Sequence, residues 1–525
     1  MSHATTANGT APAAPAGPHA EIEDLPELQP LGPANQELAG KVHPTDWQNP
    51  APEDRYDLVV LGGGTAGLVA AAGAAGIGAR VALVEKHLLG GDCLVTGCVP
   101  SKALIRAARA AHDARSAGRF GVHAGEVTVD FAALMDRMRS ERASIARHDS
   151  AARFRDLGVD VFLGAGRFTG PEAVEVDGRT LRFKRAVIAT GARAATPPIP
   201  GADDPRVLTN HTLFSLTELP ERFVVVGGGP IGTEMAQSFA RFGSKVTLVE
   251  AGPRILAGDD PDASEVVTAA LERDGVEVLV GAKVQSFEDT GGALEVRVEH
   301  GGESRSIPAD RVLLAVGRAP NVDGLGLEAA DVRFDPRKGV EVDDTLRTSN
   351  KRVYASGDVA SKWKFTHAAD FLSRTVLRNA FFPGSSKASD LVVPWATYTD
   401  PEVAHVGHTA ASAREAGLDH GVVRVDLSDN DRAVLDGATE GFVKIVHDRK
   451  GRVLGGTVVA EHAGETIGEL VTAVRERTKL GDLASVIHPY PTVADAIRRS
   501  GDVFRKESLS PRTAKLLGKW MRIVR

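Results

Sequence analysis

The chain has 525 residues, which is too long for one ordinary hydrophobic core, so we expect two to four domains. Its formal net charge of −7 at pH 7 argues against a nucleic-acid-binding protein. No apolar run approaches the roughly 18 residues of a membrane-spanning helix. Because the N-terminus also lacks the pattern of a secretory signal, we expect a cytoplasmic protein.

The N-terminal segment does not read as a domain. Residues 1–20 are rich in Ala, Pro, Thr and Gly without apolar periodicity, and we expect them to be disordered. Several prolines and Trp47 follow between Leu31 and Asp54, which indicates an extended arm that can pack on the body. Residues 1–54 are therefore predicted to be a disordered or extended arm.

A β-α-β unit follows the arm. Its first strand, Tyr56–Leu61, runs into Gly62, Gly64 and Gly67, then an alanine-rich helix and a second strand that ends at Glu85. Glycines at this spacing allow a tight turn that brings backbone N–H groups to a pyrophosphate at the start of the helix. An acid at the end of the second strand is placed to accept hydrogen bonds from a ribose.

The same pattern occurs a second time. A strand over residues 223–226 leads into Gly227, Gly229 and Gly232, a helix to about Phe242, and a strand that ends at Glu250. Both copies have the strand, helix and acid that the motif requires, so the sequence predicts two dinucleotide sites.

The only two cysteines are Cys93 and Cys98, shortly after the first glycine motif. A disulfide that closes so small a loop is a poor structural crosslink, and a cytosolic environment tends to reduce it. We interpret the pair as a redox centre, in preference to a structural disulfide or a chance pair of buried thiols. Hydride would pass from a nicotinamide to a flavin, and electrons would pass on to the disulfide.

Helix geometry constrains this pair. Five residues along a regular helix separate two Cα atoms by about 7.5 Å, whereas a disulfide requires less than about 6.8 Å. We therefore expect the helix to break between the cysteines, at Gly97. A new helix after the break would direct its positive N-terminal end at the thiolate of Cys98.

Five segments carry a family resemblance: GGDCLVTGCVPSK (90–102), IATGA ending at residue 192, LLAVGRAPN ending at 321, VYASGDVA (353–360) and WATYTDPEVAHVG ending at 407. From about residue 55 to 499 the chain resembles the class I pyridine nucleotide-disulfide oxidoreductases, which include dihydrolipoamide dehydrogenase, glutathione reductase and mercuric reductase. The resemblance implies an enzyme with an α/β fold, with two Rossmann-like dinucleotide-binding domains and a C-terminal α+β dimerisation domain. The implied ranges are 55–200 and 325–390 for the FAD domain, 201–324 for the NAD(P) domain and 391–525 for the dimerisation domain with its tail.

The resemblance also implies roles for individual residues. Cys98 would lie against the flavin as a thiolate, Cys93 would exchange with substrate, and Lys102 and Glu234 would form a pair beside flavin N5. The FAD-binding residues would be Gly62, Gly64, Gly67, Glu85, Lys86, Gly91, Lys102, Thr190, Gly191, Asp358, His367 and Ala368. The NAD(P)-binding residues would be Gly227, Gly229, Gly232, Glu250 and Gly317.

The chain departs from the family near its C-terminus, in the segment from His488 to Asp495. Tyr490 stands where dihydrolipoamide dehydrogenases and glutathione reductases place a catalytic histidine, and Asp495 replaces their glutamate. A tyrosine titrates near 10 and cycles protons poorly at neutral pH, so we expect slow turnover of lipoamide or glutathione disulfide. Mercuric reductases also carry a tyrosine here, but their C-terminal cysteine pair is absent from this chain. His488 is the alternative proton donor, with a packing role as the competing interpretation.

Two further features leave alternatives open. Glu250 would repel a 2′-phosphate and favours NADH, while Arg254 nearby keeps NADPH possible. The tail from Pro511 to Arg525 is basic and amphipathic, with Leu516, Leu517, Trp520, Ile523 and Val524 as candidate apolar positions. We favour packing of this tail on its own or a partner subunit over contact with an anionic membrane.

The leading hypothesis is a homodimeric, mercuric reductase-like FAD enzyme without a resident metal. It would use NADH to reduce Cys93–Cys98 and would pass the electrons to a metal ion, a quinone, oxygen or a small disulfide. The alternatives are a dihydrolipoamide dehydrogenase that uses His488, and a flavin redox sensor with low turnover.

Overall fold

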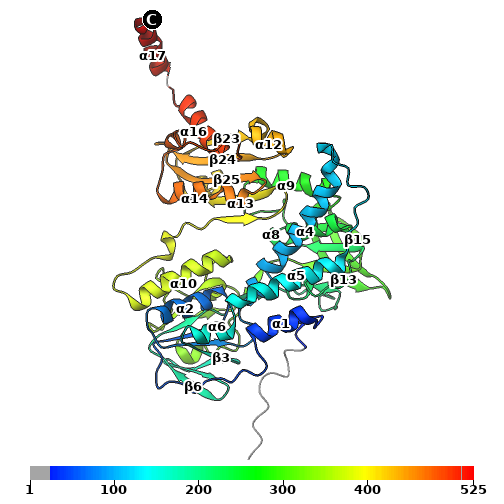
Figure 1. Cartoon of the computed structure of the whole chain (residues 1–525), viewed down its shortest axis with the longest axis vertical. Helices are drawn as coiled ribbons and strands as arrows, with labels where there is room; N and C mark the ends of the chain where they lie inside the picture. Colours follow the sequence, from blue (N-terminus) through cyan, green and yellow to red (C-terminus); the bar gives the residue numbers. More distant parts are fainter. Residues whose placement is uncertain (1–23, 510) are drawn as a thin grey trace, which may run out of the picture.

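The computed structural model describes residues 24–509 and 511–525, so the predicted disorder of residues 1–20 lies outside the described part. Two nucleotide-domain sheets occupy the lower part of the molecule, a third sheet lies above them, and the last helix projects from the top (Figure 1). Within the described residues, no helix is both long and apolar enough to cross a membrane.

The first nucleotide domain is built on a parallel five-stranded sheet in the order β20-β7-β1-β2-β3. All four residues of β1 and all five of β2 are buried, as expected for parallel strands covered on both faces. Helix α2 follows β1 and packs against α10, which returns from much later in the chain. The elements are β1 (Leu58–Leu61), α2 (Thr65–Gly76), β2 (Val81–Glu85), β3 (Val159–Leu163), β7 (Ala186–Ile188), β20 (Val353–Ala355) and α10 (Thr366–Phe381).

A small antiparallel sheet and several helices complete this domain. Helix α4 carries the redox segment away from the nucleotide turn and packs against α5 and α8. The elements are α3 (Gly91–Val95), α4 (Cys98–Ser116), α5 (Phe131–Ile145), α6 (Ala151–Asp156), β4 (Arg167–Gly170), β5 (Ala173–Val176), β6 (Arg179–Arg182), β18 (Phe334–Asp335) and β19 (Gly339–Val340).

The second nucleotide domain repeats the architecture, with a parallel sheet in the order β12-β11-β10-β16-β9. The antiparallel pair β8 and β17 joins it to the first domain. The elements are β8 (Ala192–Ala194), β9 (Val207–Leu208), α7 (Asn210–Leu213), β10 (Arg222–Val226), α8 (Pro230–Phe242), β11 (Lys245–Glu250), α9 (Pro261–Arg273), β12 (Glu277–Val280), β13 (Ala282–Asp289), β14 (Leu294–His300), β15 (Glu303–Ala309), β16 (Arg311–Leu314) and β17 (Arg318–Pro320).

The C-terminal domain is an antiparallel sheet in the order β21-β22-β25-β24-β23, covered by short helices. The elements are β21 (Trp395–Thr397), β22 (Glu402–Gly407), α11 (Ala410–Glu415), β23 (His420–Asp426), α12 (Asp431–Asp436), β24 (Phe442–Asp448), β25 (Val453–Ala460), α13 (Ala463–Thr466), α14 (Gly468–Arg475), α15 (Leu480–Leu483), α16 (Asp495–Glu507) and α17 (Pro511–Val524). The predicted α/β fold, with two Rossmann-like domains and a C-terminal α+β domain, is confirmed.

The N-terminal arm differs from the extended chain that the sequence suggested. Residues Pro33–Val42 form helix α1, which begins with proline at its first position. Leu38 and Val42 lie one helical turn apart and are fully buried, and α1 packs against α5. Burial of this apolar stripe accounts for a helix in a segment of low overall hydrophobicity.

Candidate active site

The two cysteines lie on either side of a helix break, as predicted. Helix α3 ends at Val95, and α4 begins at Cys98. A Cβ atom at Gly97 would come within 2.8 Å of the Asp92 carbonyl oxygen, so the close approach of the chain at the break requires glycine. Both cysteines are free thiols in this structure, and Cys98 is exposed.

The surroundings of Cys98 favour its thiolate. A hydrogen bond from the Cys93 thiol lowers the pKa of Cys98 to about 6, with further help from Thr366 and from the charge of Lys102. Thr366 Oγ1 lies 3.2 Å from Cys98 Sγ. The pKa of Cys93 is raised, first because its proton is held in the bond to Cys98 and then by burial. The pair thus shares one proton, with the negative charge on Cys98 at the start of α4.

Lys102 and Glu234 form an ion pair across the two nucleotide domains. Lys102 Nζ lies 2.9 Å from Glu234 Oε2, and the Glu234 side chain is buried at the start of α8. The backbone N–H of Tyr398 donates to Glu234 Oε1 at 2.9 Å, and Lys102 Nζ stands 4.5 Å from the centre of the Tyr398 ring. These contacts fix a cation one turn along α4 from Cys98.

Asp92 connects the redox segment to the second nucleotide domain. Its carboxylate accepts hydrogen bonds from Asn210 Nδ2 at 2.7 Å and from Thr96 Oγ1 at 2.8 Å. Arg318 Nη1 lies 2.9 Å from Asp92 Oδ2, and Arg318 Nε lies 3.3 Å from Asp358 Oδ2. Burial raises the pKa of Asp358. Arg318 therefore bridges Asp92, the residue before Cys93, and Asp358 of the segment VYASGDVA (353–360).

The first glycine turn has the geometry of a dinucleotide cradle. Gly62 has φ +104°, and a Cβ atom at Gly67 would lie only 1.8 Å from the Gly62 carbonyl oxygen. Glu85 accepts hydrogen bonds from the backbone N–H groups of Gly63 and His87, at 2.5 and 2.7 Å. No side chain caps the start of α2. This combination of a tight turn, an uncapped helix start and an acid at the strand end fits the adenosine side of FAD.

The second glycine turn repeats this geometry at a cavity of about 770 Å³. Glu250 accepts from the N–H groups of Gly228 and Gly252 at 2.6 and 2.5 Å. A Cβ atom at Gly232 would lie 1.9 Å from the Gly227 carbonyl oxygen. The cavity is lined by the second glycine turn, the end of β11, the start of β13 and the β16–β17 connection. Its lining residues include Gly227, Gly229, Glu250, Lys283, Gly317 and Arg318.

Arg254 does not extend beside Glu250. Its guanidinium donates to the backbone carbonyls of Leu256, Ala257 and Asp259 at 2.8–3.0 Å. Arg254, the residue that kept NADPH possible in the sequence analysis, thus binds the loop before α9.

The other FAD residues implied by the resemblance have varied surroundings. Thr190 Oγ1 donates to the Asn321 carbonyl at 2.7 Å, and Gly191 has φ +69°. Gly91 packs against the first glycine turn, because a Cβ atom there would lie 2.8 Å from Gly64 Cα. Ala368 is buried in α10, Lys86 is exposed, and the exposed His367 ring bonds the Pro394 carbonyl at 2.7 Å.

The C-terminal segment offers no unengaged imidazole. Tyr490 is 77% exposed, and its hydroxyl donates to Asp431 at 3.0 Å. His488 Nε2 lies 2.7 Å from Glu469 Oε2, and its Nδ1 faces the Val486 carbonyl at 3.1 Å. Asp495 does not contact Tyr490 but pairs with Arg498 at 2.7 Å. Within the described chain, no hydrogen bond or ion pair joins this segment to either cysteine.

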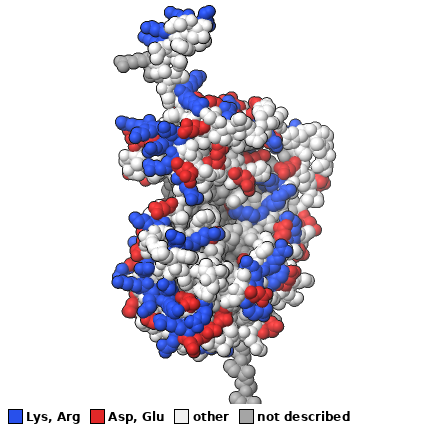
Figure 2. Space-filling model, turned by 60° about the vertical axis from the view of Figure 1, so that its left-hand side comes forward, with Lys and Arg blue, Asp and Glu red and all other residues white. Residues whose placement is uncertain are grey.

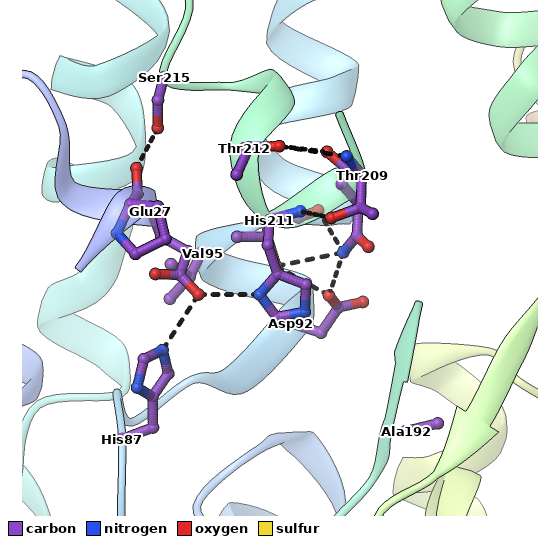
Figure 3. Close-up of polar contacts among 12 residues, drawn as sticks. Glu27, His87, Asp92, Val95, Ala192, Thr209, His211, Thr212 and Ser215 are labelled. Carbon is purple, nitrogen blue, oxygen red and sulfur yellow. Dashed lines mark hydrogen bonds and ion pairs between the residues drawn. The ribbon is translucent and has the colours of Figure 1, made fainter. Parts of the chain in front are cut away.

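The N-terminal arm reaches the redox segment through a buried polar network. Figure 3 shows the Glu27 carboxylate between the imidazoles of His87 and His211, at 3.3 and 2.8 Å. Arg142, fully buried, donates to the Val95 carbonyl at 2.6 Å and to Asn35 Oδ1 at 2.6 Å. Burial lowers the pKa of Arg142 to about 10. The arm therefore holds the end of α3, two residues beyond Cys93.

Sequence reasoning missed Thr366, Asp92, Arg318 and Glu27. Thr366 stands directly before His367, and Asp92 directly before Cys93, so both lie next to residues that the resemblance had singled out. Their partners are far away in the chain: the contact between Cys98 and Thr366 spans 268 residues. No local pattern reports such contacts.

Comparisons with known proteins identify the family of this chain. Residues 56–371 match the family model of pyridine nucleotide-disulphide oxidoreductases, and residues 393–500 match the dimerisation domain of that family. A mercuric reductase of Bacillus cereus is 36% identical over 453 residues, which cover 86% of this chain and 72% of that protein. A dihydrolipoyl dehydrogenase of Thermus scotoductus is 35% identical over 462 residues, which cover 86% of this chain and 98% of that protein.

A solved structure has the same architecture. The HOCl-induced flavoprotein disulfide reductase RclA from Escherichia coli aligns with a TM-score of 0.76 and 29% sequence identity, over 85% of this chain and 99% of that one. The family resemblance seen in the sequence is thereby confirmed, and the dimerisation domain supports a homodimer.

Proposed function

This chain belongs to the pyridine nucleotide-disulphide oxidoreductase family, and we propose that it uses NADH to reduce a Cys93–Cys98 disulfide and then delivers two electrons to a small thiophilic acceptor. The observation that carries this proposal is the polarised thiol pair, in which Cys98 has a pKa of about 6 at the start of α4. A stabilised thiolate is a good leaving group when a disulfide is reduced, because lower-pKa thiols leave faster.

The overall reaction balances in two halves. The hydride equivalent of NADH converts the disulfide to one thiol and one thiolate, and this pair then passes two electrons to the acceptor and releases its one proton as the disulfide reforms. Bound FAD would supply the hydride acceptance that no side chain offers. The first glycine turn, Glu85 and Asp358 are the residues that would hold it.

The protein's own side chains manage charge and protons around the sulfurs. The Lys102 ammonium, held by Glu234, offsets the negative charge on Cys98. The Thr366 hydroxyl can donate a hydrogen bond to the Cys98 thiolate. Cys93 keeps its proton in the reduced pair because its pKa is raised, and it loses that proton when the disulfide reforms.

NADH is the proposed coenzyme because Glu250 lines the cavity of the second glycine turn. A carboxylate there accepts hydrogen bonds from ribose hydroxyls and repels a 2′-phosphate. Backbone carbonyls of the loop before α9 hold the Arg254 guanidinium, which forms no ion pair with Glu250 in the described part of the chain. Lys283 also lines the cavity. Replacing it with alanine therefore tests whether its positive charge contributes to NADPH binding.

The proposed acceptor is one whose reduction needs no histidine to donate a proton beside Cys93. Tyr490 donates its proton to Asp431, which raises the pKa of the tyrosine further above neutrality. A thiophilic metal ion such as Hg(II) fits, because soft thiolates are its preferred ligands and the ion needs no proton from the protein. A mercuric reductase and a dihydrolipoyl dehydrogenase match this chain almost equally, at 36% and 35% identity, so the choice of acceptor rests on the chemistry of the site.

A dihydrolipoamide dehydrogenase activity is the second candidate, and the His488–Glu469 pair favours it. A carboxylate 2.7 Å from an imidazole orients the ring for proton transfer. Against it, both ring nitrogens of His488 already face acceptors within the same subunit.

An acceptor screen tests the proposal. The full-length, FAD-loaded protein is assayed for NADH and NADPH oxidation with Hg(II) in excess thiol, lipoamide, glutathione disulfide, a soluble quinone and oxygen. We expect the highest kcat/KM with NADH and Hg(II), and loss of that activity in Cys93→Ser. Efficient lipoamide turnover, with kcat/KM of about 10⁵ M⁻¹s⁻¹ or more, would favour His488 as the acid and overturn the acceptor assignment.

A further inference from the structure

The C-terminal helix α17 (Pro511–Val524) stands clear of the body of the molecule. It projects beyond α16 at the far end of the C-terminal domain (Figure 1). Every side chain described from Lys515 to Arg525 is exposed, including Trp520 at 61% and Ile523 at 78%. The sequence analysis favoured packing of this tail on its own or a partner subunit. Packing on its own subunit is wrong for the described residues, and packing on a partner subunit stays a prediction.

The two faces of α17 are sharply divided. At about 100° per residue, six apolar side chains fall within an arc of about 160°; they are Leu516, Leu517, Trp520, Met521, Ile523 and Val524. Lys515, Lys519 and Arg522 fall within about 60° on the opposite side. Exposed apolar residues in a continuous stripe mark an interaction surface.

The charge of the segment is opposite to that of the chain as a whole. Residues 511–525 contain five Lys or Arg and no Asp or Glu, whereas the whole chain carries −7. Figure 2 shows basic and uncharged side chains, without acidic ones, on the visible face of the projecting helix. Its partner must therefore offer negative charge beside an apolar phase.

We propose that α17 docks this enzyme on the surface of an anionic lipid bilayer. The helix would lie in the interface, with Trp520 and its apolar neighbours among the acyl chains and Lys515, Lys519 and Arg522 at the headgroups. A wide apolar face opposite a basic face, on a helix too short to span, is the pattern of interfacial helices.

The same features disfavour a second copy of this helix as the partner. Paired helices bury a narrow seam of two positions per heptad, which would leave much of the 160° arc exposed. A family dimer would carry two such helices.

Vesicle sedimentation with the full-length enzyme tests the proposal. The vesicles are phosphatidylcholine alone or phosphatidylcholine with phosphatidylglycerol, at low and high salt. Lys515→Glu/Lys519→Glu tests the basic face, and Leu516→Ser/Trp520→Ser tests the apolar face. The matched charge control is Lys351→Glu/Lys450→Glu on the body, where both lysines are exposed. Gly518→Ala is the helix control, because nothing lies within 4 Å of its added Cβ.

We expect binding to the phosphatidylglycerol vesicles that weakens with salt, and little binding to phosphatidylcholine. The Lys515→Glu/Lys519→Glu variant should bind at least about 20-fold more weakly, since each cation contributes roughly fivefold near an anionic surface. Both controls should bind like the wild type, and all variants should keep the NADH-dependent reduction of a soluble dye.

Three results would overturn the proposal. One is no wild-type binding to anionic vesicles. Another is equal weakening in the tail variant and in the body charge control. The third is a change of oligomeric state in the tail variants without lipid, which would assign α17 to a protein interface.

Discussion

The thiolate of Cys98 should depend on the hydroxyl of Thr366. Thr366→Val removes a polar atom that lies 3.2 Å from Cys98 Sγ and keeps nearly the same shape. Thr366→Ser keeps the hydroxyl and serves as the control. The valine variant should therefore raise the pKa of Cys98, and the serine variant should not.

The expected shift can be estimated from the contact. A hydrogen bond to a charged group contributes about 1.5–3 kcal/mol, and one pKa unit corresponds to about 1.4 kcal/mol. Because Cys98 is exposed and water can replace part of the lost contact, we take the lower end, about one unit. The pKa would rise from about 6 to about 7, and the thiolate fraction at pH 7 would fall from about nine tenths to one half.

The assay is the pH dependence of iodoacetamide alkylation of the reduced enzyme. Mass spectrometry of the peptide between Lys86 and Lys102, which holds both cysteines, separates Cys98 from Cys93 by fragmentation. The midpoint of the profile is more informative than a rate at one pH, because a less acidic thiolate is also about threefold more nucleophilic per pKa unit. Equal midpoints in the valine and serine variants would refute the role of Thr366.

Three further predictions concern other parts of the site. NADH should exceed NADPH in kcat/KM, and Glu250→Gln should narrow that preference by about tenfold, or about 1.4 kcal/mol; an unchanged ratio would mean that another residue selects the coenzyme. Tyr490→His should raise lipoamide turnover by at least about tenfold, and no gain in steady-state assays would show that the missing imidazole is not limiting. Although burial opposes it, hydrogen bonds from His211 and His87 hold the pKa of Glu27 well below its usual range. Burial lowers the pKa of His87, but the hydrogen bond to Glu27 and the charges of Glu27 and Glu85 together raise it. Ionised Glu27 thus stabilises the fold above about pH 4.3, and protonated His87 stabilises it below about pH 6.5. Glu27→Gln should therefore lower the thermal midpoint most near pH 5–6, where both groups are charged. The control Glu37→Gln, at an exposed position, should change the thermal midpoint little at any pH.

The sequence predicted the elements whose signals are local. The two glycine turns follow apolar strands and precede helices, and their order alone indicated two Rossmann-like domains. The break between α3 and α4 followed from the length that a helix imposes between Cys93 and Cys98. Each inference needed only neighbouring residues and the geometry of one element.

Features that depend on distant parts of the chain were not predictable in this way. Helix α1 was missed because prolines on both sides outweighed the spacing of Leu38 and Val42, although burial against α5 decides its structure. The orientation of Arg254 could not be read from its position near Glu250, since loop carbonyls hold it. Thr366 required knowledge that the start of α10 meets the start of α4.

The most direct test of the central claim is a thiol count before and after NADH. The purified enzyme is treated anaerobically with NADH, quenched in denaturant and alkylated, and its mass is compared with that of an untreated sample. Because Cys93 and Cys98 are the only cysteines, the account predicts none alkylated in the air-oxidised enzyme and two per chain after NADH. An NADH-treated sample that still shows no reactive thiol, while its flavin is fully reduced, would contradict the account.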